Sequence, residues 1–343
     1  MKILFLCRLF YPHIGGVEKH VMEISEILIK KGHEVIVITE QLEDTSLKEK
    51  KEGITIYRIP GGGDDWFKKF RIWKGMWNLR NVIRKADVVH SHDVFFWYLP
   101  FRFLYPNKPV YTTFHGFEGY PITPKAIRMR RIWEKLAWGN ICIGDYLKKW
   151  FGTKPTLVLY GGIESMHYNN IQVNSLPAIP HIVMLARLEP DIGVESYLDL
   201  LGYLREKKIR FTFTSVGDGS LRQEVAKFGS ITGFVTDTGH WLKQADIVFA
   251  SSYLSTLEAL SFGKLVVTVY ETSIKRDCYI LSPFGKSVLL GNDPKELGKQ
   301  LISVIKNDTR RAQLLQNSYE WLQKQTWDDI AEAYLLLWQK RFR

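Results

Sequence analysis

Cysteine is scarce in this sequence, and its scarcity excludes two kinds of structural support. Cys7, Cys142 and Cys278 are the three cysteines among 343 residues, and no pair of them has CxxC spacing. We therefore expect neither a disulfide framework nor a zinc site built on cysteines. Reduced structural cysteines of a cytoplasmic protein are the interpretation that this pattern favours.

Long hydrophobic runs are also missing. The most apolar longer run, residues 94–105, is interrupted by Pro100 and Arg102 and is too short to span a bilayer. At the N-terminus, five apolar residues separate Lys2 from Arg8, which is too few for the core of an export signal. We interpret this first segment as a β-strand and expect no transmembrane segment.

Motifs that would indicate other chemistry are absent as well. No GxGxxG follows the first apolar run, so a dinucleotide-dependent oxidoreductase fits poorly. No DxD motif and no cluster of histidine and aspartate at metal-ligand spacing occurs, so we expect neither a metal ion nor a cofactor.

Positive charge is present in excess, and most of it lies in the first half of the chain. Residues 1–170 hold 26 Lys and Arg against 17 Asp and Glu (+9), and the remaining residues hold 21 against 19 (+2). The excess is interleaved with tryptophan in Trp66–Lys85 and in Ile127–Trp138. Such segments suit an anionic membrane surface, but a solvated basic face with its aromatic rings in the core fits equally well.

The basic segments also bear on partners and location. No nucleic-acid motif accompanies them, so we do not expect nucleic acid as a partner. We expect a cytoplasmic protein, attached peripherally to the inner face of the membrane if the basic segments bind lipid.

Short apolar runs alternate with helical periodicity along both halves of the chain. Runs such as Ile3–Cys7 and Ile54–Ile59 are apolar on both faces, as expected for parallel strands covered by helices. Further strands are expected at Glu34–Thr39, Asp87–His90, Val110–Thr113, Asn140–Ile143, Ile182–Ala186, Phe211–Val216, Ile231–Val235, Ile247–Phe249 and Leu265–Val269. The fold class that follows is α/β, with two doubly wound parallel-sheet (Rossmann-like) domains facing a central cleft.

A polar stretch with two prolines, Asn169–Pro180, is the natural linker between the halves. We expect one domain over residues 1–168, a second over residues 169–325, and a last helix within residues 326–343.

The stretch Val248–Thr268 joins a buried strand to a helix through small polar residues. Ser255 and Thr256 are good N-cap residues, so we expect the helix to start there, with Glu258 one turn in. The positive end of a helix suits an anion, and a carboxylate suits hydroxyl groups. This stretch is therefore a candidate binding site.

Seven segments, in order along the chain, resemble the retaining glycosyltransferases of GT-B fold in family 4 (glycosyl transferases group 1). They span about 260 residues and read PHIGGVEKH (Pro12–His20), DVVHSHD (Asp87–Asp93), TFHG (Thr113–Gly116), LYGGIE (Leu159–Glu164), ARLEPDIGVESYL (Ala186–Leu198), VGDGSLR (Val216–Arg222) and LEALSFGKLVV (Leu257–Val267). The resemblance implies an acceptor-binding first domain, a second domain that binds a nucleotide-sugar, and a last helix that crosses back to the first domain.

The resemblance, together with the chemistry of the residues, implies a donor site. Arg187 can neutralise a diphosphate by bidentate contacts, and glycines let a backbone approach the phosphate or sugar. The expected donor-binding residues are Gly15, Gly16, Arg187, Gly217, Asp218, Ser255, Thr256, Leu257, Glu258 and Glu271. Among them Asp218 is also favoured as a loop former.

Three residues, His115, Arg187 and Glu258, are the candidates for catalysis. His115 can bind a sugar hydroxyl or, through its backbone carbonyl, stabilise positive charge at the anomeric carbon. The expected acceptor-binding residues are Glu18, His115 and Glu118. Each catalytic candidate has a plain alternative: a strand-end histidine, a surface ion pair, and an acid favoured by the helix dipole.

The sequence departs from the family pattern at two positions. Ile192 stands where a lysine accompanies the phosphate-binding arginine, and Ala250 stands where the first of two glutamates would read the donor sugar. Losing one charged phosphate contact costs about 1.5–3 kcal/mol unless another cation reaches in. The candidate cations are Lys264, Lys275 and Arg276.

The function that the sequence favours is a metal-independent, retaining hexosyl transfer to a hydroxyl of a glycan or lipid-linked acceptor. The alternative, motivated by Ile192 and Ala250, is a weak or inactive nucleotide-sugar-binding homologue that acts as a subunit of a two-component transferase.

Overall fold

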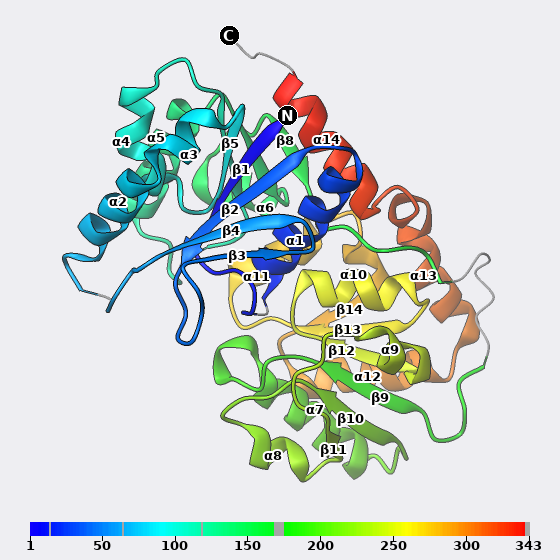
Figure 1. Ribbon diagram of the computed structural model, residues 1–343. Coiled ribbons are helices and arrows are strands. Elements are labelled where there is room, and N and C mark those ends of the chain that lie inside the picture. The colour runs from blue at the N-terminus through cyan, green and yellow to red at the C-terminus, as the bar shows by residue number, and fades with distance from the viewer. Residues whose placement is uncertain (14, 64, 118, 168–174, 340–343) are drawn as a thin grey trace. The chain divides into compact units, whose positions relative to one another are not determined.

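The computed structural model describes residues 1–13, 15–63, 65–117, 119–167 and 175–339. The chain divides into two compact units: unit 1 is Met1–Gly162 with Trp327–Arg343, and unit 2 is Ile163–Thr326. Each unit is a parallel sheet covered by helices (Figure 1), which confirms the predicted α/β class with two Rossmann-like domains. From the sequence, we expect the divisions after residues 168 and 325.

In the described part of unit 1, eight strands form one sheet in the order β3-β4-β2-β1-β5-β6-β7-β8. Every pairing is parallel except that of β3 with β4. The strands are β1 (Lys2–Cys7), β2 (Glu34–Glu40), β3 (Lys48–Lys51), β4 (Ile54–Ile59), β5 (Val88–His92), β6 (Val110–Phe114), β7 (Gly139–Ile143) and β8 (Leu157–Leu159).

The helices of unit 1 include the last helix of the chain. They are α1 (Gly16–Lys30), α2 (Lys68–Asn78), α3 (Arg80–Lys85), α4 (Phe95–Leu104), α5 (Pro124–Leu136), α6 (Tyr146–Phe151) and α14 (Trp327–Gln339). Helix α14 packs against α1 and buries Tyr334 and Trp338 in unit 1.

Unit 2 has a sheet whose described strands are all parallel, in the order β11-β10-β9-β12-β13-β14. The strands are β9 (His181–Leu185), β10 (Thr212–Val216), β11 (Ser230–Ile231), β12 (Ile247–Ala250), β13 (Leu265–Val269) and β14 (Val288–Gly291). The helices are η1 (Pro190–Ile192), α7 (Val194–Glu206), α8 (Arg222–Ala226), α9 (Gly239–Gln244), α10 (Tyr253–Ser261), α11 (Ser273–Ile280), η2 (Gly285–Ser287), α12 (Pro294–Ile305) and α13 (Asp308–Leu322).

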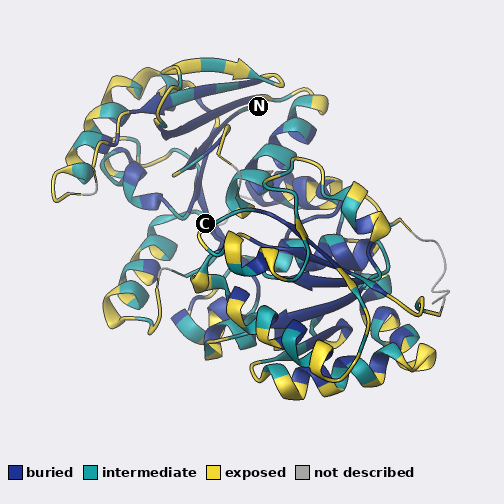
Figure 2. Cartoon of the chain, turned by 90° about the horizontal axis from the view of Figure 1, so that it is seen from below, coloured by how far each residue is buried: buried dark blue, intermediate teal, exposed yellow. Residues whose placement is uncertain are grey.

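Each unit has a hydrophobic core of its own. In unit 1, Trp97, Tyr98 and Phe101 of α4 pack against the β-strands, and in unit 2 Tyr197 and Leu201 of α7 do so. Buried residues concentrate on the strands, and exposed residues lie on the outer helix faces (Figure 2). Because the strands run parallel, the loops after them gather at one edge of each sheet.

One strand was predicted with the wrong bounds, and three strands were not predicted from the sequence. The strand expected at Ile231–Val235 is limited to β11, because the chain turns at Gly233 and Phe234 is 62% exposed. The missed strands are β3, β8 and β14. Strand β3 reads KEKK and pairs only with β4, so it lacks the apolar pattern of a buried strand.

Candidate functional site

Helix α10 begins at Tyr253, earlier than the sequence suggested. Its N-cap is Ser252, whose hydroxyl accepts from Ser255 N at 3.3 Å, while Ser255 Oγ accepts from Ser252 N at 3.1 Å. This reciprocal pair is a capping box. The predicted helix start at Ser255 or Thr256 is therefore wrong, because Ser252 caps the amide that lies three residues further on.

The earlier start changes what the residues of α10 can offer a ligand. Thr256 and Leu257 are fully buried, and Thr256 donates to Ser252 O at 2.9 Å. Both side chains are buried in unit 2, and the donor contacts predicted for them stay a prediction. Glu258 lies in the second turn rather than the first, and its Oε2 accepts from Thr238 Oγ1 at 3.0 Å.

The turn after β9 carries Arg187 with its guanidinium in the solvent. One Nη lies 3.2 Å from Asp191 Oδ2, and both side chains are more than half exposed. An exposed ion pair of this kind contributes little to stability. Arg187 can therefore leave Asp191 for an incoming anion at small cost.

The loop after β10 packs closely on the turn after β9. Leu188 N donates to Asp218 O at 2.8 Å, and a Cβ on Gly217 would lie 1.8 Å from Ala186 O. Asp218 accepts from Gly219 N and pairs with Arg222 at 2.7 Å, a hydrogen bond that holds the pKa of Asp218 below its usual range. These contacts give Gly217 and Asp218 roles in building the loop, and their donor contacts stay a prediction.

Glu271, in the loop after β13, approaches the same turn. A Cβ on Gly193 would lie 3.0 Å from Glu271 Oε1, so the carboxylate stands directly beside the end of η1. The structure thus brings Arg187, Asp191 and Glu271 around one turn at the carboxyl edge of the unit 2 sheet.

In unit 1, the first glycine loop is shaped around a carboxylate. A Cβ on Gly15 would lie 2.3 Å from Glu18 Oε2, so Gly15 makes room for Glu18 before α1 starts at Gly16. His13 Nδ1 lies 3.3 Å from Glu18 Oε1. Burial raises the pKa of Glu18, with a backbone hydrogen bond and His13 opposing the rise.

His115 follows β6 and is 8% exposed. Its backbone N donates to Asp93 Oδ1 at 3.1 Å, its Nε2 lies 2.8 Å from His92 Nδ1, and its carbonyl accepts from Tyr146 Oη at 3.5 Å. Burial lowers the pKa of His115 well below its usual value, so the ring is neutral. Among the described residues its Nδ1 has no hydrogen-bond partner. The third predicted acceptor residue, Glu118, lies outside the described residues.

A cavity of about 730 Å³ opens within unit 1 beside Glu18. Carboxylates and indoles line it together, among them Asp93, Trp66, Trp97 and Trp133. Carboxylates accept hydrogen bonds from hydroxyl groups, and indoles offer flat apolar faces. The cavity therefore suits a hydroxyl-rich ring.

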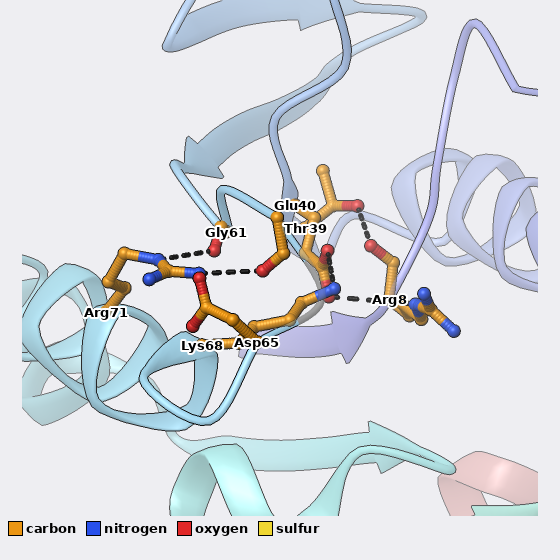
Figure 3. Close-up of polar contacts among 8 residues, drawn as sticks. Arg8, Thr39, Glu40, Gly61, Asp65, Lys68 and Arg71 are labelled. Atoms are coloured by element: carbon orange, nitrogen blue, oxygen red, sulfur yellow. Dashed lines mark hydrogen bonds and ion pairs between the residues drawn. The ribbon is translucent and has the colours of Figure 1, made fainter.

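Glu40, at the end of β2, organises the wall of this cavity (Figure 3). Its carboxylate lies 2.9 Å from Lys68 Nζ and 3.7 Å from Arg8 Nε. On the neighbouring segment, Arg71 donates to Gly61 O at 2.9 Å and pairs with Asp65 at 3.1 Å. Arg8, Lys68 and Arg71 are thus engaged with carboxylates of unit 1, whereas Lys69, which also lines the cavity, lies over the Trp66 ring.

Three residues of this cavity, Arg8, Glu40 and Lys68, were not predicted from the sequence. A signal existed for Glu40, since it ends the apolar run EVIVITE and so stands at the same sheet edge as the glycine loop. Lys68 had no such signal, because only the fold brings α2 beside the end of β2.

The two basic, tryptophan-containing segments behave differently. Around α2, Trp66 is 74% exposed, Phe67 64% and Trp77 51%. In the second segment, Trp133 and Trp138 pack against the core of unit 1. The first segment is an aromatic surface, whereas the second follows the alternative of a basic face with its rings in the core.

Arg130, in the second segment, is a buried residue. It is 8% exposed, its guanidinium lies 3.8 Å from the Phe151 ring centroid, and it donates to Gly116 O at 2.7 Å. Arg130 is therefore a structural residue of unit 1 and is buried away from any membrane surface.

Within the described ranges, no helix is long and apolar enough to cross a membrane. Nor do the described His, Cys, Asp and Glu side chains include a group of three or more that could hold a metal ion.

Two family models match the chain, one in each half. Glycosyltransferase Family 4 matches residues 14–164, and Glycosyl transferases group 1 matches residues 179–307. The chain belongs to the group 1, family 4 glycosyltransferases. Its fold is that of the GT-B members of this family.

Some curated relatives match a short segment of this chain, and others match nearly its whole length. The GPI3 subunit of phosphatidylinositol N-acetylglucosaminyltransferase from Saccharomyces cerevisiae is 32% identical over 100 residues, which cover 26% of this chain and 21% of that one. The phosphatidyl-myo-inositol mannosyltransferase of Mycobacterium leprae is 22% identical over 383 residues, covering 99% of this chain and 96% of that one. Among solved structures, an Anabaena protein in complex with UDP and glucose has a TM-score of 0.71 at 15% identity, covering 98% of this chain and 99% of that one.

Proposed function

We propose that this glycosyltransferase moves a hexosyl group from a nucleotide-diphosphate sugar to a hydroxyl of a glycan or lipid-linked acceptor, with retention of configuration. One observation carries the proposal. Arg187 and Glu258 follow two neighbouring parallel strands, β9 and β12, in the half that matches the group 1 glycosyltransferases. Ligands bind at this edge of open α/β sheets.

The donor is assigned to unit 2. Arg187 would exchange its exposed partner Asp191 for the diphosphate, which offers two charges in place of one. Glu258 would accept from the ribose hydroxyls in place of the Thr238 hydroxyl. The UDP and glucose bound to the Anabaena protein of the same fold support this class of donor.

The acceptor is assigned to unit 1, at the cavity beside Glu18. Its carboxylates and indoles favour a hydroxyl-rich head group, and two of its cations, Arg8 and Lys68, are already paired with Glu40. The names of the two curated relatives, both of which act on phosphatidylinositol lipids, support a lipid that carries such a head group.

The reaction we propose needs no side-chain nucleophile. The acceptor hydroxyl attacks the anomeric carbon on the face from which the diphosphate leaves, and a leaving phosphate oxygen takes the hydroxyl proton. Arg187 neutralises the charge that develops on the leaving group. Neutral His115 offers its Nδ1 to a sugar hydroxyl. No metal ion is required, so an excess of EDTA should leave the rate unchanged.

Peripheral attachment to an anionic membrane is proposed for the α2 surface alone. The exposed rings of Trp66, Phe67 and Trp77 would enter the interface, and Lys69 and Arg80, which lie against these rings, would meet anionic head groups. Such a surface would bring a lipid-linked acceptor to the cavity, because Trp66 also lines it.

The test is a panel of nucleotide sugars given to the purified protein with a detergent-solubilised membrane lipid extract. We expect release of a nucleoside diphosphate from one donor, together with a lipid of higher mass by one hexose. An Arg187→Ala variant should lose at least tenfold in this release. Donor binding without hydrolysis or transfer, with the extract present, would contradict the proposal.

A second candidate function is a nucleotide-sugar-binding subunit of a two-component transferase. Ile192 and Ala250 favour it, because each removes a charged group that the family pattern places at the donor. Its signature would be tight donor binding and no turnover until a partner protein is added.

A further inference from the structure

The turn after β9 holds one cation where the family pattern has two. Arg187 is present, and Ile192 stands at the position of the expected lysine. The Ile192 side chain packs against the hydrophobic core of unit 2. Position 192 therefore gives this turn an apolar, partly buried side chain and no charge.

A lysine from another element reaches the backbone of Ile192. Lys275, in the first turn of α11, donates from Nζ to Ile192 O at 3.0 Å. An ammonium group carries three N–H donors, and Ile192 O uses one of them. The charge missing from the side chain at position 192 is thus present at the same turn, supplied from 83 residues further along the chain.

The other two candidate cations lie elsewhere or are engaged. Lys264 precedes β13 and donates to Lys243 O at 3.3 Å, which places it at the amino edge of the sheet, opposite the turn. Arg276 points to its neighbour Asp277, with 3.4 Å between Nη2 and Oδ1. Of the three, only Lys275 meets the turn that carries Arg187.

Carboxylates near Lys275 oppose the effect of its burial. Burial, the largest effect, lowers the pKa of Lys275, and the nearby Glu271 and Asp191 offset part of that fall. A diphosphate entering between Arg187 and Lys275 would add negative charge beside the ammonium and favour the charged form further.

We propose that Lys275 is the second phosphate-binding cation of the donor site and compensates for Ile192. This inference rests on the donor assignment made above. It also predicts what the contact recognises: the diphosphate, irrespective of the base or sugar attached to it. Loss of Lys275 should then weaken binding of diphosphates and leave binding of the nucleoside unchanged.

The experiment is calorimetric titration of the wild type and of Lys275→Met with UDP, GDP, uridine and guanosine. We expect the Kd for the preferred diphosphate to rise at least tenfold in Lys275→Met, with the Kd for its nucleoside within twofold of the wild type. Lys275→Arg should recover most of the loss. Lys264→Met is the matched control, since it removes a lysine from the opposite edge, and should bind as the wild type does.

The outcomes separate the two proposals. A wild type that binds neither diphosphate contradicts the donor assignment, and this inference falls with it. A wild type that binds, with Lys275→Met within twofold of it, overturns this inference alone. If Lys275→Met weakens nucleoside and diphosphate equally, the lysine holds the turn in shape and does not bind phosphate, which also overturns the inference.

Discussion

At the scale of single residues, His90 shows how hydrogen bonds set protonation in unit 1. Trp338 Nε1 donates to His90 Nδ1 at 3.1 Å, so the proton of the neutral ring is on Nε2, which donates to Thr113 Oγ1 at 2.8 Å. The Tyr334 hydroxyl lies 2.8 Å from Thr113 Oγ1 and 3.0 Å from His20 Nε2. Because the Nδ1 of His90 accepts from Trp338, this contact requires a neutral His90 ring.

The buried histidines predict that unit 1 loses stability in mild acid. Burial lowers the pKa of His20 to about 3, and those of His90, His92 and His115 fall well below their usual value. The unfolded chain takes up protons near pH 6.5, so this stability is complete above that pH and lost as the pH falls below it. For His20 alone, the loss between pH 7 and pH 5 is about 2 kcal/mol.

The measurement is urea denaturation followed by tryptophan fluorescence at pH 7.5 and pH 5.0. We expect a lower midpoint at pH 5.0, and the same shift in a His240→Gln control, because His240 is exposed. Equal midpoints at the two pH values would show that these rings do not titrate as described.

Residue identity alone could nominate the donor cations but could not choose among them. Arg187 was predicted from the family resemblance of its turn and the chemistry of its guanidinium, and the structure has this turn directly after β9. Choosing Lys275 over Lys264 needed the fold, because the contact with Ile192 spans 83 residues of sequence. The burial of Thr256 could likewise not be predicted from the sequence, because it depends on where α10 begins.

At the scale of elements, strongly patterned segments were predictable and weakly patterned ones were not. The expected strands Ile54–Ile59 and Leu265–Val269 agree with β4 and β13. The start of α10 was ambiguous because two serines, Ser252 and Ser255, can both cap a helix. Strand β3 is charged and lies at an edge, so its existence depends on pairing with β4 rather than on burial.

Helix α2 carries a prediction about membrane binding. Phe67→Ser and Trp77→Ser should each weaken sedimentation with anionic phosphatidylglycerol vesicles roughly tenfold, because each removes a ring that the interface would bury. Phe234→Ser is the matched control, since Phe234 is 62% exposed and belongs to unit 2. Unchanged sedimentation of both α2 variants would refute the assignment of this surface.

At the scale of the whole molecule, the chain returns to its first unit at its end. Helix α14 belongs to unit 1, although about half the chain lies between it and the rest of that unit. A Cβ on Gly162 would lie 2.6 Å from the Trp327 ring, so the residues where the chain leaves unit 1 and returns to it lie in close contact. Apolar periodicity predicted the helix itself, and its place in unit 1 was implied only by the family resemblance.

The return of α14 predicts that its buried face stabilises unit 1. Trp338→Ala should lower the free energy of unfolding by about 3–5 kcal/mol, because Trp338 is 6% exposed and its indole also binds His90. Leu336→Ala, on the same helix but 50% exposed, should cost less than about 1 kcal/mol. Equal effects of the two changes in urea denaturation would mean that α14 does not pack as described.

The proposed activity is tested most directly by NMR of the transfer reaction. The protein is incubated with UDP-glucose or GDP-mannose, each carbon-13-labelled at the anomeric position, and with solubilised phosphatidylinositol. We predict a new anomeric signal, bonded to the lipid, with the same configuration as the donor. A lipid product of the opposite configuration would contradict retention, and labelled free sugar without any lipid product would contradict transfer to this class of acceptor.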